Sequence, residues 1–129
     1  MLSPKTFRYL PLACLLFSLA ALAAHPNPFL GKWYGSSRGD QWQEFTLVIQ
    51  PPTQASAGHL SGDILLDDGT DLPLSHIHIE GRHIVMQLSS PDGDTYTISG
   101  TLRHGQLSGK YHSDNSAGTW KATRTKPTQ

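Results

Sequence analysis

Cysteine is almost absent from this 129-residue sequence, in which Cys14 is the only residue of its type. A single thiol can neither close a disulfide within the chain nor build a zinc site of the kind held by several cysteines. Cys14 also lies in an N-terminal segment that we expect to be removed, which excludes cysteine nucleophiles and redox pairs from the folded chain. The fold must therefore be held together by its hydrophobic core.

An excess of positive charge is also lacking. Ten Lys and Arg residues balance ten Asp and Glu residues, and the net charge is 0 with neutral histidine. Without Lys5 and Arg8 of the N-terminal segment, eight basic residues remain against ten acidic ones, a net charge of about −2. Nucleic acids and anionic membranes are bound by basic faces. We therefore expect neither a nucleic-acid partner nor, after loss of that segment, a membrane.

Long apolar runs occur only near the N-terminus. Lys5 and Arg8 precede the run LPLACLLFSLAALAA at 10–24, which ends in small residues. This pattern is typical of a secretory signal peptide, and the run is too short for a membrane span of roughly 20 residues. We predict a signal peptide at 1–24 and one domain at 25–129, located in the periplasm or secreted.

Helical periodicity is absent after Phe29, and most enzyme motifs are absent with it. The chain has no Gly-x-Ser-x-Gly elbow and no glycine-rich phosphate loop followed by a helix. Paired carboxylates such as Asp67 with Asp68 and Asp92 with Asp94 stand in turn-like segments. We expect no enzyme activity and no cofactor.

Alternation of apolar and polar residues runs through the rest of the chain and indicates β-strands. The strands are predicted at 31–38, 42–50, 58–66, 72–79, 83–89, 94–103, 106–112 and 117–125. The short connections favour an antiparallel meander, and a meander of this many strands hides its edges best by closing. We predict an all-β fold, an eight-stranded antiparallel up-and-down barrel of the lipocalin type. A β-sandwich, which would usually need a longer crossover, is the rival.

A recurring glycine supports closure. Gly62, Gly100 and Gly109 each follow an aliphatic residue by two positions, and Gly35 follows Trp33 in the same way. These glycines thus share the inward face, where a residue without Cβ lets a strand bend sharply. We interpret them as structural residues.

Two local irregularities are predicted as well. In LPLSHIHIE the inward parity changes between Leu74 and Ile77, which indicates a β-bulge near Ser75. Gly81 at the first central position of the 80–83 turn favours a type II′ hairpin. Because many large apolar residues have the inward parity, we expect a largely filled interior.

Both ends of the domain resemble known barrels. LGKWYG at 30–35 and GTWKATR at 118–124 resemble the first and last strands of calycins, the group of lipocalins, avidins and bacterial metalloprotease inhibitors. The resemblance implies that Trp33 plugs one end and that Arg124 stacks on it by a cation–π interaction. The order of segments is also similar to small exported bacterial β-modules of unknown function, which implies fold and compartment but no reaction.

One group of residues suggests a metal site. His76, His78 and Glu80 share a face of one strand, and the turn places His83 opposite Glu80. Cross-strand neighbours lie about 5 Å apart, and zinc accepts nitrogen and oxygen ligands. The alternative is that these are ordinary solvent-facing residues.

We expect an exported, non-enzymatic binding or interaction module that acts on an unknown protein or small ligand of the cell envelope. It would use the barrel end and loops near Tyr34, Trp42 and the 113–117 turn. One alternative is an inhibitor of a periplasmic protease or hydrolase. The other is a carrier of a small apolar ligand, which needs a cavity of a few hundred Å³. Such a cavity would be lined by Phe45, Ile64, Met86, Tyr96 and Tyr111.

Overall fold

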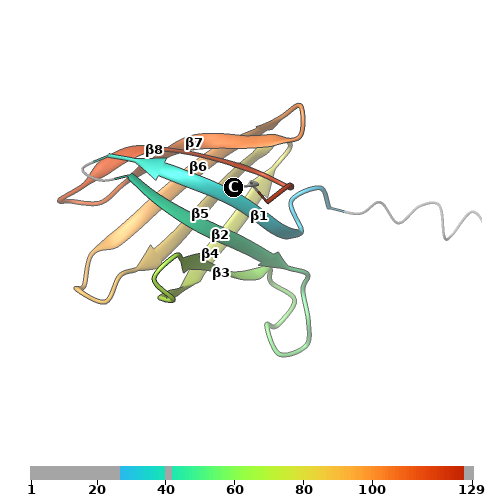
Figure 1. The fold of residues 1–129 in the computed structure, drawn as a ribbon. Coiled ribbons are helices and arrows are strands. Elements are labelled where there is room, and N and C mark those ends of the chain that lie inside the picture. The colour runs from blue at the N-terminus through green and yellow to red at the C-terminus, as the bar shows by residue number, and fades with distance from the viewer. Residues whose placement is uncertain (1–26, 40–41, 127–129) are drawn as a thin grey trace, which may run out of the picture.

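The computed structural model describes residues 27–39 and 42–126, and within them it is a closed barrel of eight antiparallel strands (Figure 1). Each strand pairs with the next, and β1 pairs with β8, so no edge is left open. The strands are β1 (Gly31–Arg38), β2 (Trp42–Gln50), β3 (Ser61–Leu66), β4 (Asp71–Glu80), β5 (His83–Ser89), β6 (Thr95–Arg103), β7 (Gln106–His112) and β8 (Ala117–Thr123). The predicted fold class is confirmed, and no residue of these ranges is helical. Within them, accordingly, no helix is long and apolar enough to cross a membrane.

Strand β3 begins at Ser61, so the predicted start at residue 58 is wrong. The preceding segment turns instead of extending, because Ala57 and Gly58 have positive φ angles of 55° and 79°. The Ser56 hydroxyl lies 2.8 Å from the His59 carbonyl and 3.1 Å from the Thr53 carbonyl, and its single hydrogen, donated to one of them at a time, stabilises the turn. The alternation of apolar and polar residues does not reveal such side-chain hydrogen bonds. Because they hold residues 53–59 in a turn, β3 begins later than the alternation predicts.

The two predicted irregularities are present. The pairing of β4 with β5 shifts register between Leu74 and His76, which leaves Ser75 as the extra residue of a bulge. Its hydroxyl donates to the Gln87 carbonyl at 3.0 Å. At the end of β4, Gly81 has a φ of 64° and Arg82 does not have a positive φ, as a type II′ turn requires.

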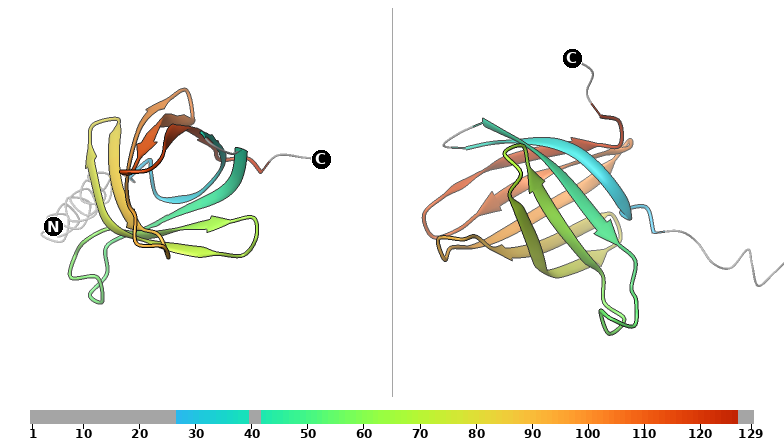
Figure 2. Two further views of the ribbon diagram at one scale, coloured as in Figure 1. Left: turned by 90° about the vertical axis from the view of Figure 1, so that its left-hand side faces the viewer. Right: turned by 60° about the horizontal axis from the view of Figure 1, so that its bottom comes forward.

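The up-and-down order sorts the connections onto two ends of the barrel. One end, here called the mouth, faces the viewer in the left view of Figure 2 and carries the connections 67–70, 90–94 and 113–116 together with the link from Arg38 of β1 to β2. The other end, here called the closed end, carries residues 27–30, the segment 51–60 and the turns 81–82 and 104–105. The connections at the mouth are therefore the ones that would surround an opening into the barrel interior.

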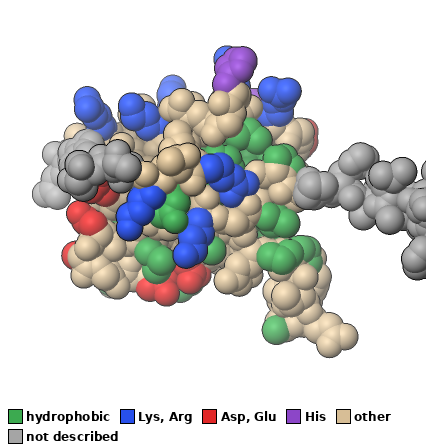
Figure 3. Space-filling view, turned by 45° about the vertical axis from the view of Figure 1, so that its right-hand side comes forward, with side chains coloured by type: hydrophobic (Ala, Val, Ile, Leu, Met, Phe, Trp, Pro, Cys, Tyr) green, Lys and Arg blue, Asp and Glu red, His purple; other side chains and the backbone are tan. Residues whose placement is uncertain are grey.

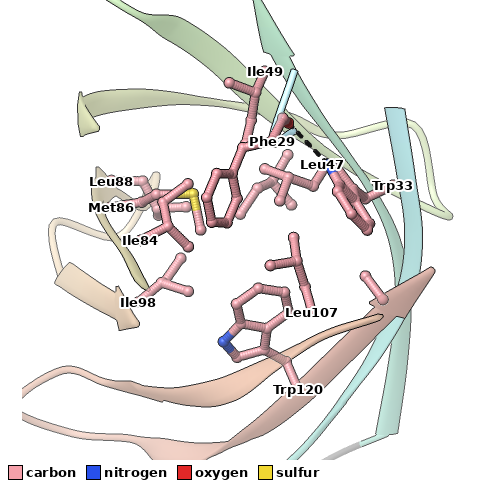
Figure 4. Packing of buried hydrophobic residues seen from close by; sticks show 12 residues of the cluster. Phe29, Trp33, Leu47, Ile49, Ile84, Met86, Leu88, Ile98, Leu107 and Trp120 are labelled. Carbon is pink, nitrogen blue, oxygen red and sulfur yellow. Dashed lines mark hydrogen bonds between the residues drawn. The ribbon is translucent and has the colours of Figure 1, made fainter. Parts of the chain in front are cut away.

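Phe29 and Trp33 fill the closed end. Both are buried, and the Trp33 indole Nε1 donates to the Phe29 carbonyl at 2.9 Å (Figure 4). Asn27 Oδ1 accepts from the Phe29 amide at 2.9 Å and directs the chain inward. Phe29 precedes the first strand and was not assigned to the core from the sequence. The rest of the buried cluster is Leu47, Ile49, Ile64, Ile84, Met86, Leu88, Ile98, Leu107, Trp120 and Ala122.

Arg124 covers this plug from outside. Its guanidinium carbon lies 3.8 Å from the Trp33 ring centroid. Nη2 donates to the Pro28 carbonyl at 2.6 Å and Nη1 to the Lys32 carbonyl at 3.2 Å. The side chain therefore ties the end of β8 to the segment that enters β1.

We expect Arg124→Met to lower the free energy of unfolding by about 1 kcal/mol, because the cation–π contact is lost with the two hydrogen bonds. Arg103→Met is the matched control, since Arg103 is an exposed arginine at the same end, and it should change stability by less than about 0.5 kcal/mol. Denaturant unfolding measures both variants. Equal stability of the two would show that Arg124 does not hold the closed end.

Glycines let the strands approach each other on the β6–β7 side. Gly100 and Gly109 are paired across the two strands. A Cβ on Gly109 would overlap the Ser99 carbonyl, and one on Gly100 would lie 2.6 Å from the Trp120 ring. Trp120 therefore lies against a wall without side chains, and its Nε1 donates to the Ser99 carbonyl at 3.0 Å.

Candidate functional site

The mouth half of the barrel encloses a cavity of about 660 Å³. Its inner surface is formed by apolar side chains, among them Leu47, Ile64, Met86, Leu88 and Ile98. Polar residues at the rim include Ser37, Gln43, Thr70, Ser90 and Ser116. The expectation of a filled interior is wrong. The alternation shows which side chains point inward but not where they lie along the barrel axis. Phe29 and Trp33 pack at the closed end, so the large side chains are not spread evenly along the axis.

Four of the residues that the sequence suggested for ligand binding meet in this cavity: Phe45, Met86, Tyr96 and Tyr111. The rings of Tyr96 and Tyr111 are tilted by 45° with centroids 6.1 Å apart. Phe45 meets Trp120 edge-on, also at 6.1 Å between centroids. Trp120, which the sequence analysis did not name as a ligand-binding residue, is therefore part of the aromatic lining.

The other two suggested residues lie elsewhere. Tyr34 faces outward, opposite Thr46, and lines a separate outer hollow of about 270 Å³ with Glu44 and Lys126. It does not contribute to the cavity, because it has the parity opposite to that of Trp33. Trp42 begins β2 opposite Arg38, and its side chain lies outside the described residues.

The polar groups inside the cavity are few. The Trp120 indole N–H is already bonded to Ser99. Tyr96 adds a phenol to the lining, and a polar group in an apolar pocket can orient a bound molecule.

The histidine group does not assemble as a metal site. His78 and Glu80 approach to 3.5 Å, and both side chains are highly exposed. His83 pairs with Glu80 along the backbone, but its Nδ1 lies 3.0 Å from the Thr101 hydroxyl on β6. His76 is opposite Gln87. Among the described residues, no three His, Asp or Glu side chains are placed to share an ion. The geometry thus favours solvent-facing residues.

A further hollow of about 530 Å³ lies on the outer face of β1, β7 and β8. Arg38, Lys110 and Lys121 line it together with Ser36 and Ser108. The polar lining residues of this hollow, here called the outer groove, have the outward parity, and Trp120 lines both the groove and the cavity.

Comparisons with known proteins bear on the fold. No protein-family model and no curated protein matches the chain, so the resemblance to calycins stays a prediction. A designed protein described as a fluorescence-activating β-barrel matches with a TM-score of 0.53 and 16% sequence identity. The match covers 75% of this chain and 94% of the designed one. At this identity the likeness supports a single conclusion, that the chain has the architecture of a closed β-barrel.

Proposed function

We propose that the protein binds a small, largely apolar molecule inside the barrel. The observation that carries the proposal is the cavity of about 660 Å³. Its volume falls within the roughly 300–1,000 Å³ of small-molecule sites. One end is blocked by Phe29 and Trp33, so a ligand would enter through the mouth and contact apolar and aromatic walls.

The inhibitor alternative is less well supported. The inhibitors that the ends of the chain resemble carry a tail that enters the protease, and that tail would have to come from the segment before β1. In this protein Phe29 is fully buried and the Asn27 side chain bonds its amide. From residue 27 onward the segment is therefore tied to the closed end. Residues 1–26 lie outside the described residues, and export to the periplasm or beyond remains part of the proposal.

We expect the neutral dye Nile red to bind the protein at one site, with a blue-shifted emission typical of an apolar environment. Leu66→Trp should weaken this binding roughly tenfold or more, because Leu66 points into the cavity and a larger ring would occupy it. Fluorescence titration measures both. The mutant should remain folded, since Leu66 is only half-buried beside free volume.

Leu65→Trp is the matched control. Leu65 is the preceding residue, faces outward and is 38% exposed, so the same substitution there should leave dye affinity unchanged. Equal weakening by both variants, or no saturable binding at all, would contradict a ligand site inside the barrel.

A further inference from the structure

The described lining of the cavity contains no cationic side chain. Its one charged residue is Asp92, at the rim beside Ser90. A ligand carboxylate inside the barrel would therefore meet no Lys, Arg or His of this lining. Burying an unpaired charge is costly, which disfavours fatty acids and other apolar anions.

The topology extends this asymmetry to three of the four connections at the mouth. The fourth follows Arg38 of β1, which lines the outer groove, and His112 at the end of β7 also has the outward parity. The connections 67–70, 90–94 and 113–116 contain no Lys, Arg or His. Their acidic residues are Asp67, Asp68, Asp92, Asp94 and Asp114. The closed end instead carries Arg82, Arg103 and Arg124. Figure 3 turns the closed end partly toward the viewer; basic side chains lie across the whole visible face, and acidic ones lie at its left and lower left.

Hydrogen bonds lower the pKa of two of the mouth carboxylates and so favour their ionised form. The Ser90 hydroxyl and, more weakly, the Asp94 amide donate to Asp92 and lower its pKa. Thr70 lowers the pKa of Asp68 in the same way. Asn115 Nδ2 donates to both oxygens of Asp94, at 3.0 and 3.1 Å, and joins two of the mouth connections. The negative charge therefore sits on ordered turns.

Aromatic rings in the interior also favour positively charged ligands. Tyr96, Tyr111, Phe45 and Trp120 line the cavity. The face of an aromatic ring carries partial negative charge and attracts organic cations. A mouth that is acidic and a wall that is aromatic thus favour the same sign of ligand charge.

We propose that the cavity selects molecules that join an apolar body to an organic ammonium group, over neutral analogues and above all over carboxylates. This inference rests on the proposed function and adds the class of ligand. The apolar body occupies the interior, and the ammonium group lies near the aromatic rings or at the rim beside Asp92.

Three probes with one aromatic body test the charge preference: 1-naphthylmethylammonium, 1-naphthalenemethanol and 1-naphthoate. Each competes with bound Nile red, and each is also titrated directly by tryptophan fluorescence, because Trp120 lines the cavity. We expect the ammonium to bind roughly tenfold or more tightly than the carboxylate at low salt. The difference should shrink at high salt, since screening shortens the reach of the rim charges. The competition format also separates the two hollows, because a carboxylate bound in the basic outer groove would not displace Nile red from the cavity.

The charge of the mouth is then changed without changing its shape. Asp92→Asn keeps the acceptor oxygen used by Ser90 and should reduce the ammonium-to-carboxylate ratio by roughly threefold or more. The double variant Asp67→Asn/Asp68→Asn should reduce it as well. Glu80→Gln at the closed end is the matched control and should leave the ratio unchanged.

The outcomes separate the two proposals. Dye binding that Leu66→Trp blocks, with equal competition by ammonium and carboxylate, would overturn the charge preference and leave the ligand site standing. A preference that survives Asp92→Asn and the double variant would also overturn it. Binding of neither the dye nor any probe would overturn both proposals.

Discussion

Replacing Gly109 with valine is expected to lower the free energy of unfolding by roughly 3 kcal/mol or more, or to prevent folding altogether. A Cβ at this position would overlap the backbone carbonyl of Ser99 and would lie 2.7 Å from the Gly100 Cα. Backbone atoms cannot move aside as a flexible side chain can. The β6–β7 pairing would have to separate, and Trp120 would lose the bare wall against which it packs.

Circular dichroism and denaturant unfolding of Gly109→Val measure this effect. Ser108→Val is the control, because Ser108 is the adjacent strand residue and faces solvent. Valine is well accepted in strands, so the control should retain the stability of the parent within about 0.5 kcal/mol. A Gly109→Val variant as stable as the control would refute the view that close backbone approach at the inward glycines closes the barrel.

Phe29→Ala should cost about 3–5 kcal/mol, the usual range for removing a large aromatic ring from a core. Phe29 is fully buried although it precedes β1. It lies at the centre of the cluster between Trp33 and the Ile84 and Met86 side of the barrel (Figure 4). Its loss would leave a void at the closed end and remove packing from the Trp33 ring.

Thermal and denaturant unfolding test this prediction against Val85→Ala, a truncation of an apolar residue that is 40% exposed on the outer face. The control should lose less than about 1 kcal/mol. If Phe29→Ala were no less stable than Val85→Ala, the N-terminal segment would not belong to the core.

Most of the strand pattern was accessible from the sequence because it depends on neighbouring residues. Alternation with a period of two assigned inner and outer faces, and the parity change around Ser75 located the bulge. The start of β3 was not accessible in this way, since the segment before it forms a turn that the Ser56 hydroxyl stabilises by a hydrogen bond to a backbone carbonyl. Phe29 escaped notice for a similar reason, because it enters the core from a turn and belongs to no alternating run.

The candidate site was predicted only in part. Parity identified Phe45, Met86, Tyr96 and Tyr111 as inward residues, and the cavity brings them together. It did not indicate that a cavity exists, because free volume depends on how side chains from all strands share the axis. Tyr34 was expected near the barrel end that binds a partner, but its parity puts it on the outer face.

The sequence by itself determined the strands, their faces and the closed architecture, because these follow from local alternation, turn chemistry and the need to hide strand edges. Only the tertiary structure decided where the interior is filled and where it is hollow. It also decided that three acidic turns far apart in the chain surround one opening, while three of the four described arginines lie at the other end. The physical reason is that packing and electrostatic fields depend on distances in space, which pairing around the ring sets and which no single segment contains.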